Sequence, residues 1–430
     1  MSTPEAGRVA FLRTVEIHRA APHVQQLDEH LRAAGAEAKL FFTDGDCGPG
    51  DFPGPSERVP TDATPRQIAE QIRRWGANAF VSISLRDENA LRDALVAAEL
   101  AADGVANVMH GAETTCLLAN KAETKALLRR AGFCVPDDVA VDGDVLNGRT
   151  VPMPGYRDYL ARRANEIGFP LLSKPLWDSF GNGIRYLGNP AALAEYLRSP
   201  LDGNTLLERC LDGELCSVEI IGRVGTYHVQ PLVWKGRTGG EPSFLFGLVR
   251  YAGPRPEAER NFEDVAERLV RLCSELDVNG ALEVEMIYRD GVYHVIEINP
   301  RVSGTTLLSI VASGRNTYVE LLNMALQNWP DPRRTSLTGI RWALEFPITD
   351  PTPSLLRDAA AAIDVVRAGT LRISGQDYGG NMVASCEFGE EPSFVKAINE
   401  LNARHRFLEP RILHEIRDLL VPGGLTARSA

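Results

Sequence analysis

The chain has 430 residues, of which 44% are hydrophobic and 24% charged, and its formal net charge is −11. This length predicts roughly two or three domains, and the composition is that of a soluble globular protein. The acidic balance, with no block of Lys or Arg, argues against nucleic acid or an anionic membrane surface as the main partner. It leaves a nucleotide possible as a ligand, because a single pocket needs only a few local cations.

Cysteine usage and hydropathy point to a cytoplasmic location. The seven cysteines are irregularly spaced and form no Cys-x-x-Cys pair, which is typical of reduced thiols. No apolar run approaches the roughly 18 residues of a membrane span, and the N-terminus lacks the basic start and apolar stretch of a signal peptide. We therefore expect a cytoplasmic protein with no membrane partner.

The N-terminal part alternates short apolar strands with helices, which predicts a parallel sheet covered on both faces. No Gly-x-Gly-x-x-Gly follows the first strand, so the usual dinucleotide fingerprint is missing. Residues 1–114 are therefore expected to form a Rossmann-like α/β domain without its own nucleotide site. The expected strands are Arg8–Arg13, Ala38–Phe42 and Ala79–Ser84, and the expected helices are Pro22–Ala34 and Pro65–Trp75.

A glycine-containing loop follows a predicted strand in the next region. The strand Leu171–Pro175 carries Lys174 and runs into the loop Asp178–Gly183. Glycines let backbone N–H groups close around phosphate oxygens, and a nearby Lys adds a point charge. An ordinary turn is the alternative. Lys121 begins a charged helix some fifty residues earlier, and taken alone it would be a solvated surface lysine.

An acidic segment, Glu208–Glu214, connects two further strand candidates. Such a hinge can offer backbone groups to the edge of an adenine, and a carboxylate can accept hydrogen bonds from ribose hydroxyls. The alternative is an ordinary acidic loop. The long helix Pro256–Leu276 then follows, with apolar residues at near 3.6-residue spacing.

An acidic hairpin follows this helix. Residues 282–299 read LEVEMIYRDGVYHVIEIN, and Arg289-Asp290-Gly291 predicts a three-residue loop. Because side chains alternate along strands, this loop sorts the residues into two faces. The apolar face would hold Val284, Met286, Tyr288, Val292, Ile296 and Ile298. The polar face would hold Glu283, Glu285, Glu297 and Asn299, with Arg301 just beyond.

Carboxylates that face one another across a sheet are destabilising unless a cation or water compensates them. Oxygen ligands without His or Cys suit a hard ion such as Mg²⁺. The hairpin therefore predicts a cation site at Glu285, Glu297 and Asn299, with Glu283 as a neighbour. A solvated hairpin face is the alternative, and a two-residue turn would flip one strand and spoil the cluster.

Other candidates flank the hairpin. In VWKGRTGG, the residues Trp234, Lys235 and Arg237 are expected on a flexible loop over the site, where cations would steady an anionic intermediate. A basic surface loop is the alternative. Ser303 and Gly304 are expected to offer backbone N–H groups to a substrate carboxylate. Residues 331–430 hold enough short strands and helices for a third, α+β domain.

The order of these elements resembles the ATP-grasp superfamily over roughly residues 115–330. Lys121, Lys174 with its glycine loop, the Glu208–Glu214 hinge, and Glu285 with Glu297-x-Asn299-x-Arg301 occur in sequence. The resemblance implies an ATP-grasp fold with lobes of about 115–205 and 206–330, flanked by the N-terminal and C-terminal domains. It also implies ATP and Mg²⁺, or Mn²⁺ in its place.

The resemblance assigns roles to the matching residues. Nucleotide contacts are implied for Lys121, Lys174, Gly181, Asn182, Gly183, Glu208, Arg209, Leu211 and Glu214. Metal contacts are implied for Glu285, Glu297 and Asn299, and Arg301 is implied to face the acyl phosphate or the substrate carboxylate. Lys235 is a further catalytic candidate and Ser303 and Gly304 are further substrate-binding candidates, each from its own segment of sequence rather than from the resemblance. In this class of enzyme a carboxylate is activated as an acyl phosphate, and positioning and electrostatics supply most of the catalysis.

Two departures from the superfamily pattern narrow the resemblance. Asn182 stands where many relatives carry a basic residue, so the grip of the loop on phosphate would be weaker or would depend on Arg185. After Arg301 the chain reads VSGTT, unlike the continuation in biotin-dependent carboxylases. The tail signature of D-alanine–D-alanine ligases is also absent. The chain is more similar to L-amino-acid ligases, which join small-molecule carboxylates and amines, and dimers are common in such families, so a homodimer is expected.

The leading hypothesis is thus a carboxylate–amine ligase that forms an amide or dipeptide bond. A second hypothesis passes the acyl phosphate to another acceptor, such as a carrier-protein thiol or carboxylation chemistry. A third is a regulatory module that binds ATP without turnover. The presence of both lysines, all three metal ligands and Arg301 argues against the third.

Overall fold

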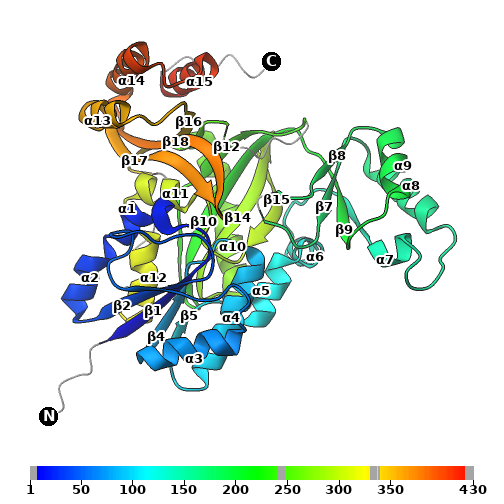
Figure 1. Cartoon of the computed structure of the whole chain (residues 1–430). Helices are drawn as coiled ribbons and strands as arrows, with labels where there is room; N and C mark the ends of the chain where they lie inside the picture. Colours follow the sequence, from blue (N-terminus) through cyan, green and yellow to red (C-terminus); the bar gives the residue numbers. More distant parts are fainter. Residues whose placement is uncertain (1–6, 180, 241–246, 330–336, 338, 422–430) are drawn as a thin grey trace.

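The computed structural model describes residues 7–179, 181–240, 247–329, 337 and 339–421. Within these ranges the strands form three sheets, of five, nine and four strands (Figure 1). No helix in the described ranges has the length and apolar character needed to cross a bilayer. The mixed α/β class predicted from the sequence is confirmed.

The N-terminal sheet is parallel, with strand order β3-β2-β1-β4-β5. Its strands are β1 (Arg8–Arg13), β2 (Glu37–Phe42), β3 (Ser56–Arg58), β4 (Ala79–Ser82) and β5 (Ala106–Val108). The connecting helical segments are η1 (Ile17–Arg19), α1 (Ala21–Val24), α2 (Leu27–Ala34), α3 (Pro65–Trp75), α4 (Asp87–Ala101) and α5 (Ala112–Ala119).

Local sequence explains why α3 begins and ends where it does. Thr64 and Gln67 form a reciprocal capping box, and Pro65 occupies the first turn, where its missing N–H has no helical partner. Gly76 ends the helix in the left-handed conformation at φ 78. The predicted helix Pro65–Trp75 therefore has the observed bounds.

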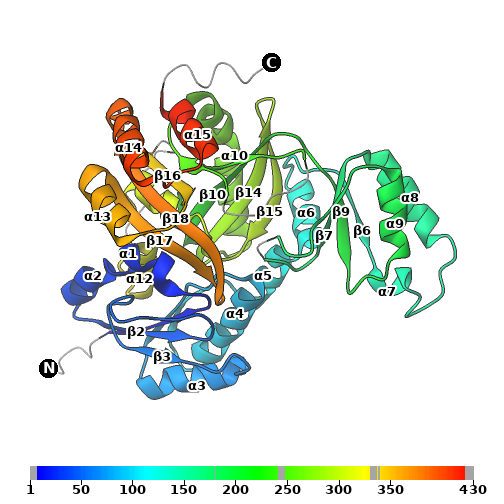
Figure 2. The same ribbon diagram turned by 45° about the horizontal axis from the view of Figure 1, so that its top comes forward.

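A smaller antiparallel sheet forms a lobe that stands apart from the rest of the molecule (Figures 1 and 2). Its order is β6-β9-β7-β8, from β6 (Asp138–Val141), β7 (Leu171–Pro175), β8 (Arg185–Leu187) and β9 (Thr205–Arg209). The helices α7 (Gly143–Leu146), α8 (Tyr156–Ile167) and α9 (Pro190–Arg198) belong to this lobe. Its apolar core includes Leu160, Leu171 and Leu193. The lobe therefore has its own core.

The central sheet runs in the order β15-β14-β10-β12-β13-β16-β18-β17, and β11 pairs with β10. Its strands are β10 (Glu214–Arg223), β11 (Thr226–Val229), β12 (Val233–Arg237), β13 (Arg250–Ala252), β14 (Gly280–Arg289), β15 (Val292–Asn299), β16 (Arg341–Ile348), β17 (Asp364–Ile373) and β18 (Gln376–Glu387). The remaining helices are α6 (Lys121–Arg130), α10 (Pro256–Glu275), α11 (Thr306–Ser313), α12 (Thr317–Ala325), α13 (Pro353–Ala362), α14 (Glu391–His405) and α15 (Pro410–Leu420).

The C-terminal strands extend the central sheet. Arg250 of β13 pairs with Glu345 of β16, so one sheet crosses the boundary expected near residue 330. Residues 330–336 themselves lie outside the described ranges. The helices α13, α14 and α15 pack against β16 and β18 around a separate apolar core (Figure 2). The domain limits given above remain a prediction.

Candidate active site

The acidic hairpin turns on two residues, so the predicted three-residue loop is wrong. Arg289 pairs with Val292, which leaves Asp290 and Gly291 in the turn at φ 51 and 80. Positive φ at both central positions defines a type I′ turn, for which Asp-Gly is a preferred pair. By itself this turn would place Glu285 opposite Ile296.

A β-bulge restores the cluster that the two-residue turn would otherwise have broken. Met286 pairs with Val295, whereas the next residue of β14, Glu285, pairs with Glu297. Ile296 is therefore the extra residue of the bulge, and it shifts the alternation of side chains beyond it by one position. The resulting pairs are Glu285 with Glu297 and Glu283 with Asn299.

The two-residue turn also changes the predicted apolar face between the turn and the bulge. Val292 is 42% exposed and does not belong to the core. Tyr293 and Val295 take its place, and they are buried together with Met286 in the core beneath α10.

Lys235 lies on strand β12, so the flexible loop expected for this segment is wrong. The strand pairs with β10, and Trp234 is 2% exposed in the core beneath the guanidinium of Arg255. The next side chain points to the opposite face of the sheet. Lys235 Nζ lies 2.8 Å from Glu283 Oε1 and 2.6 Å from Glu285 Oε1.

The two glutamates differ in how well they are compensated. Glu283 is buried, but Lys235 and the Thr305 hydroxyl, at 2.8 Å, bring its pKa down to about 2. Burial raises the pKa of Glu285 to about 7, and the carboxylates of Glu283 and Glu297 add to the effect of burial. Glu283 thus accepts hydrogen bonds from Lys235, Thr305 and Asn299, whereas the ion pair described for Glu285 is the one to Lys235.

Lys121 joins the hairpin to the glycine loop. Its Nζ lies 3.5 Å from Glu297 Oε2 and donates to the carbonyl oxygen of Asp178 at 3.2 Å. The Asn120 side chain caps the start of α6, which fixes the first turn that carries Lys121. Burial raises the pKa of Asp178 to about 7, and Glu297 and Asp87 act in the same direction. Asp178 begins the predicted glycine loop, but no role was predicted for its carboxylate.

A second lysine pair converges on Glu208. Lys174 Nζ lies 2.7 Å from Glu208 Oε1, and Lys125 forms an ion pair with the same carboxylate. Burial would raise the pKa of Glu208, but the two lysines hold it below its usual range. The sequence reasoning missed Lys125. Its position four residues after Lys121, on the same face of α6, was the available signal.

The glycine loop has the backbone geometry that requires glycine. Gly181 and Gly183 have φ 70 and 80, and a Cβ on Gly183 would lie 2.9 Å from Pro175 Cγ. Asn182 is exposed and donates from Nδ2 to the Ser179 carbonyl oxygen at 3.1 Å. Phe180 lies outside the described residues.

The residues of the hinge from Glu208 to Glu214 make contacts in two different directions. The carbonyl of Leu211 accepts a hydrogen bond from the Thr238 hydroxyl at 2.7 Å, and Glu214 forms an ion pair with Arg255. Arg209 instead donates to the carbonyl of Ile167 at 3.0 Å, at the end of α8. Its guanidinium therefore points away from the lysines around Glu208.

Arg301 lies at the junction between the hairpin and the N-terminal sheet. Its Nε donates to Asp87 Oδ1 at 2.7 Å, and its terminal nitrogens donate to Asn299 Oδ1 and the Val302 carbonyl, each at 3.3 Å. Burial opposes the charge of Arg301, but Asp87 and the glutamates of the hairpin raise its pKa overall. Asp87 was also not predicted as a site residue from the sequence, because 214 residues separate it from Arg301.

The expectation for Ser303 requires a correction. Its backbone N–H donates to the Thr306 hydroxyl at 2.9 Å, and its own hydroxyl lies 2.9 Å from Thr305 Oγ1. The N–H is therefore engaged at the start of α11, where it satisfies a local turn, and it is not directed at a substrate. Gly304 lies in the same turn.

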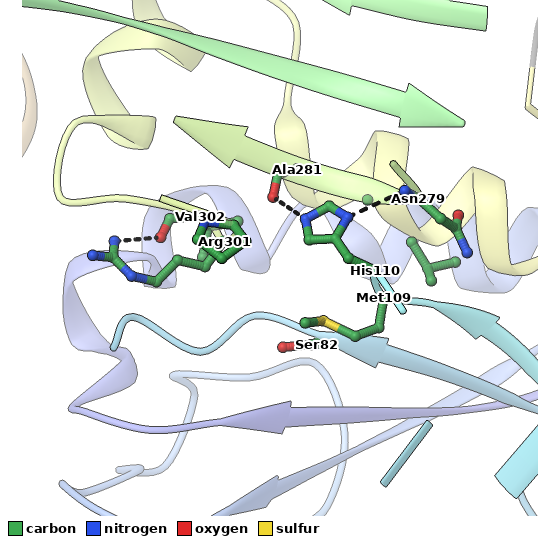
Figure 3. Close-up of a pocket in the computed structure, with 10 residues that line it drawn as sticks. Ser82, Met109, His110, Asn279, Ala281, Arg301 and Val302 are labelled. Atoms are coloured by element: carbon green, nitrogen blue, oxygen red, sulfur yellow. Dashed lines mark hydrogen bonds between the residues drawn. The ribbon is translucent and has the colours of Figure 1, made fainter. Parts of the chain in front are cut away.

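A small pocket lies behind Arg301, lined by His110, Asn279, Ala281 and Val302 among others (Figure 3). His110 Nε2 lies 3.1 Å from the Ala281 carbonyl oxygen, and the Asn279 N–H donates to Nδ1 at 3.1 Å. These bonds define the neutral Nε2–H tautomer, and burial lowers the pKa of His110 to about 4. This histidine has a structural role, joining β14 to the end of β5.

Among the described residues, no group of three or more His, Cys, Asp or Glu side chains is placed to hold a metal ion alone. The predicted set, Glu285, Glu297 and Asn299, offers two carboxylates and one amide oxygen on facing strands. Mg²⁺ usually takes few protein ligands and completes its shell with phosphate and water. The set therefore suits a magnesium ion that arrives with a nucleotide.

Lys121 links the acidic hairpin of the central sheet to the glycine loop that follows β7 of the smaller lobe. Residues 118–305 match the family model described as the ATP-grasp domain. This part of the chain is an ATP-grasp domain, and the resemblance predicted from the sequence is confirmed.

The curated relatives are distant and much longer than the matched segments. The carbamoyl phosphate synthase large chain of Saccharolobus islandicus is 22% identical over 235 residues, which cover 53% of this chain and 21% of that protein. The uncharacterized protein y4rH of Sinorhizobium fredii is 28% identical over 181 residues, covering 38% and 36% of the two chains. The chain therefore spans only part of these relatives.

Solved structures match over nearly the whole chain. An L-amino acid ligase from Bacillus licheniformis is 19% identical, covers 93% of this chain and 98% of its own, and has a TM-score of 0.66. An N5-carboxyaminoimidazole ribonucleotide synthetase from Thermus thermophilus is 15% identical, with 92% and 98% coverage and a TM-score of 0.66. A biotin carboxylase domain from Hydrogenobacter thermophilus is 14% identical, with 95% and 93% coverage and the same TM-score. At these identities the likeness concerns the fold.

Proposed function

We propose that the chain is an ATP- and Mg²⁺-dependent, ADP-forming carboxylate–amine ligase that acts on amino acids. The observation that carries the proposal is the convergence of three cations on one hairpin within the ATP-grasp domain: Lys121 and Lys235 contact its carboxylates, and Arg301 donates to the amide oxygen of Asn299. Such an arrangement can neutralise charge that spreads over a transferring phosphoryl group.

The residues present fit the ligands that the proposal requires. Glu285, Glu297 and Asn299 would hold Mg²⁺, or Mn²⁺ in its place, because they present two carboxylates and one amide oxygen on facing strands. Lys121 and Lys174, with the loop around Gly181, Asn182 and Gly183, would hold the phosphates. The hinge from Glu208 to Glu214 would hold the adenosine, through backbone groups at Leu211 and the carboxylate of Glu214.

The proposed reaction has two steps. A substrate carboxylate oxygen attacks the γ-phosphorus of ATP and ADP leaves, so an acyl phosphate forms. The amine of the second substrate then attacks the acyl carbon, loses a proton and displaces phosphate. A bound magnesium ion would supply charge neutralisation at the phosphates. Lys235 and Arg301 would steady the anionic groups and orient the two substrates.

A second candidate function keeps the same first step and changes the acceptor. The structural neighbours include carboxylases as well as an amino acid ligase, so the shared fold accommodates both acceptors. A third candidate is a regulatory module that binds ATP without turnover. A homodimer remains part of the leading proposal.

A phosphate-release assay with purified protein, ATP, Mg²⁺ and a mixture of proteinogenic amino acids tests the function. Phosphate and ADP release that depends on amino acids, with a dipeptide detected by mass spectrometry, supports the ligase. Release that depends on bicarbonate instead supports the second candidate. Nucleotide binding without turnover on any acceptor contradicts both.

A further inference from the structure

The carboxyl ends of β1 and β4 form a second place where a ligand is expected. These parallel strands are neighbours, and the chain leaves them toward opposite edges of the sheet, because β2 lies beyond β1 and β5 lies beyond β4. In open α/β sheets this change of direction opens a crevice outside the strand ends, which is where ligands bind. Helix α4 begins with Asp87, a few residues beyond the end of β4.

Asp87 and Arg301 meet beyond the carboxyl end of β4. Their side chains are 3% and 9% exposed, and Oδ1 of Asp87 accepts from Nε of Arg301 at 2.7 Å. A guanidinium has five N–H donors, and three are directed to described protein atoms, those of Asp87, Asn299 and Val302. A ligand carboxylate would engage the other N–H groups of the guanidinium, and Arg301 contacts Asp87 through Oδ1.

The surroundings place Asp87 beside the phosphate end of the site. Burial raises the pKa of Asp87, whereas Arg301 and Lys121 oppose this shift, and Glu297 adds to it. The backbone N–H of Asp87 donates to the Ser179 hydroxyl at 3.1 Å, so the start of the glycine loop also reaches this turn of α4. The carboxylate that Asp87 contributes is therefore next to the residues proposed to activate the substrate.

A buried ion pair often adds little to the stability of a protein, because replacing it by apolar residues of similar volume is often neutral or stabilising. The presence of a buried carboxylate next to a guanidinium is explained if both charged groups also contact a ligand. An α-amino acid is a zwitterion whose two charges sit on adjacent carbons, which matches a cationic group and an anionic group in contact.

We infer that Asp87 and Arg301 together recognise the α-amino acid that is activated, with Arg301 on its carboxylate and Asp87 on its ammonium group. This inference rests on the proposed ligase function and narrows its first substrate to α-amino acids. An ammonium held by Asp87 stays protonated and cannot attack an acyl phosphate, so the second amino acid is the nucleophile.

Hydroxylamine as the acceptor isolates the first substrate, because the acyl phosphate then yields a hydroxamate without a second amino acid. The assay compares L-alanine, L-leucine and L-phenylalanine with L-lactate, L-2-hydroxyisocaproate and L-phenyllactate, which replace only the ammonium group. The wild-type protein is expected to prefer the amino acid in each usable pair by about 100-fold in kcat/KM, because a hydroxyl can donate to Asp87 but does not supply the positive charge of the ammonium group.

In Asp87→Asn this preference is expected to fall at least tenfold. The variant should have a lower kcat/KM for the amino acid and an unchanged kcat/KM for the hydroxy acid. Asp93→Asn is the matched control. Asp93 is a fully buried carboxylate on the same helix, and it accepts from Ser82 and Ser84. Its substitution is expected to lower stability without changing the preference. Calorimetric titration with the preferred amino acid should show weaker binding in Asp87→Asn.

The outcomes separate the two proposals. If Asp87→Asn lowers kcat/KM equally for both members of a pair, Asp87 only positions Arg301 and the inference is overturned while the ligase function stands. If the wild type uses hydroxy acids as well as amino acids, the inference is overturned without any variant. If the wild type activates no amino acid with either acceptor, the ligase function and the inference both fail.

Discussion

Glu285 and Glu297 face each other across β14 and β15 because β15 carries one extra residue, Ile296, between the turn and the pair. The tight Asp-Gly turn determines one register, and the bulge changes it for the part of the hairpin that holds the carboxylates. Bulges commonly re-aim side chains next to active sites.

Replacing Glu297 by Gln should abolish turnover and preserve the fold. The substitution removes one of two carboxylates proposed for Mg²⁺ and the ion pair with Lys121. We expect kcat to fall by at least about 100-fold, the scale for losing a principal electrostatic contact in the transition state. Phosphate release measures the loss, circular dichroism checks the fold, and Glu267→Gln on the exposed side of α10 is the control. Near-normal activity would remove the metal assignment.

Local signals in the sequence predicted much of the fold. The capped helix Pro65–Trp75 and the first strand Arg8–Arg13 have the observed bounds. The carboxylate cluster was also located, although from a loop length that is wrong, because only an irregularity within β15 compensates for the shorter turn. Turn chemistry can be predicted from Asp-Gly, but a bulge depends on packing that a single sequence does not display.

Tertiary contacts determined the rest and could not be predicted. Asp87 reaches Arg301 from another sheet, and Lys235 reaches Glu283 because β12 lies beside β10 rather than in a loop. Lys125 shows only its spacing from Lys121 in the sequence, and this spacing does not reveal that its partner is Glu208. The continuation of β13 into β16 likewise joins strands that are far apart in the chain.

Replacing Lys235 by Met should destabilise the protein through the charges that it leaves behind. Glu283 and Glu285 would remain buried without their shared cation. Breaking a buried pair by removing one partner costs about 3–5 kcal/mol. Urea unfolding at pH 8 should show a loss of this size, and Lys235→Met/Glu283→Gln should recover part of it. A double variant no more stable than the single one would show that the carboxylate is not the cause.

Glu219 should make stability depend on pH. Burial raises its pKa to about 7, although hydroxyls of Thr306 and Thr317 donate to it and oppose the shift. A carboxyl whose folded-state pKa exceeds its unfolded value lowers stability above the folded pKa, and this penalty disappears as pH falls toward the unfolded value. Between pH 8 and 6 the free energy of unfolding should therefore rise by about 1 kcal/mol from this group.

Glu219→Gln isolates that contribution, because other groups titrate in the same range. The free energy of unfolding of the wild-type protein minus that of the variant should rise as the pH falls. Urea unfolding at several pH values measures this difference. A difference that is independent of pH would mean that Glu219 does not take up a proton in the folded state in this range.

Replacing Gly183 by Ala should weaken nucleotide binding more than it weakens the fold. The position has φ 80, and the new Cβ would lie 2.9 Å from Pro175 Cγ, so the loop must shift at the end of the strand that carries Lys174. Gly148→Ala is the matched control, because Gly148 has φ 67 with nothing within 4 Å of the added Cβ. Both variants should lose about 1 kcal/mol of stability from the left-handed backbone. Only Gly183→Ala should also raise the dissociation constant of an ATP analogue in calorimetry, and equal affinities in the two variants would argue against a phosphate-binding role for this loop.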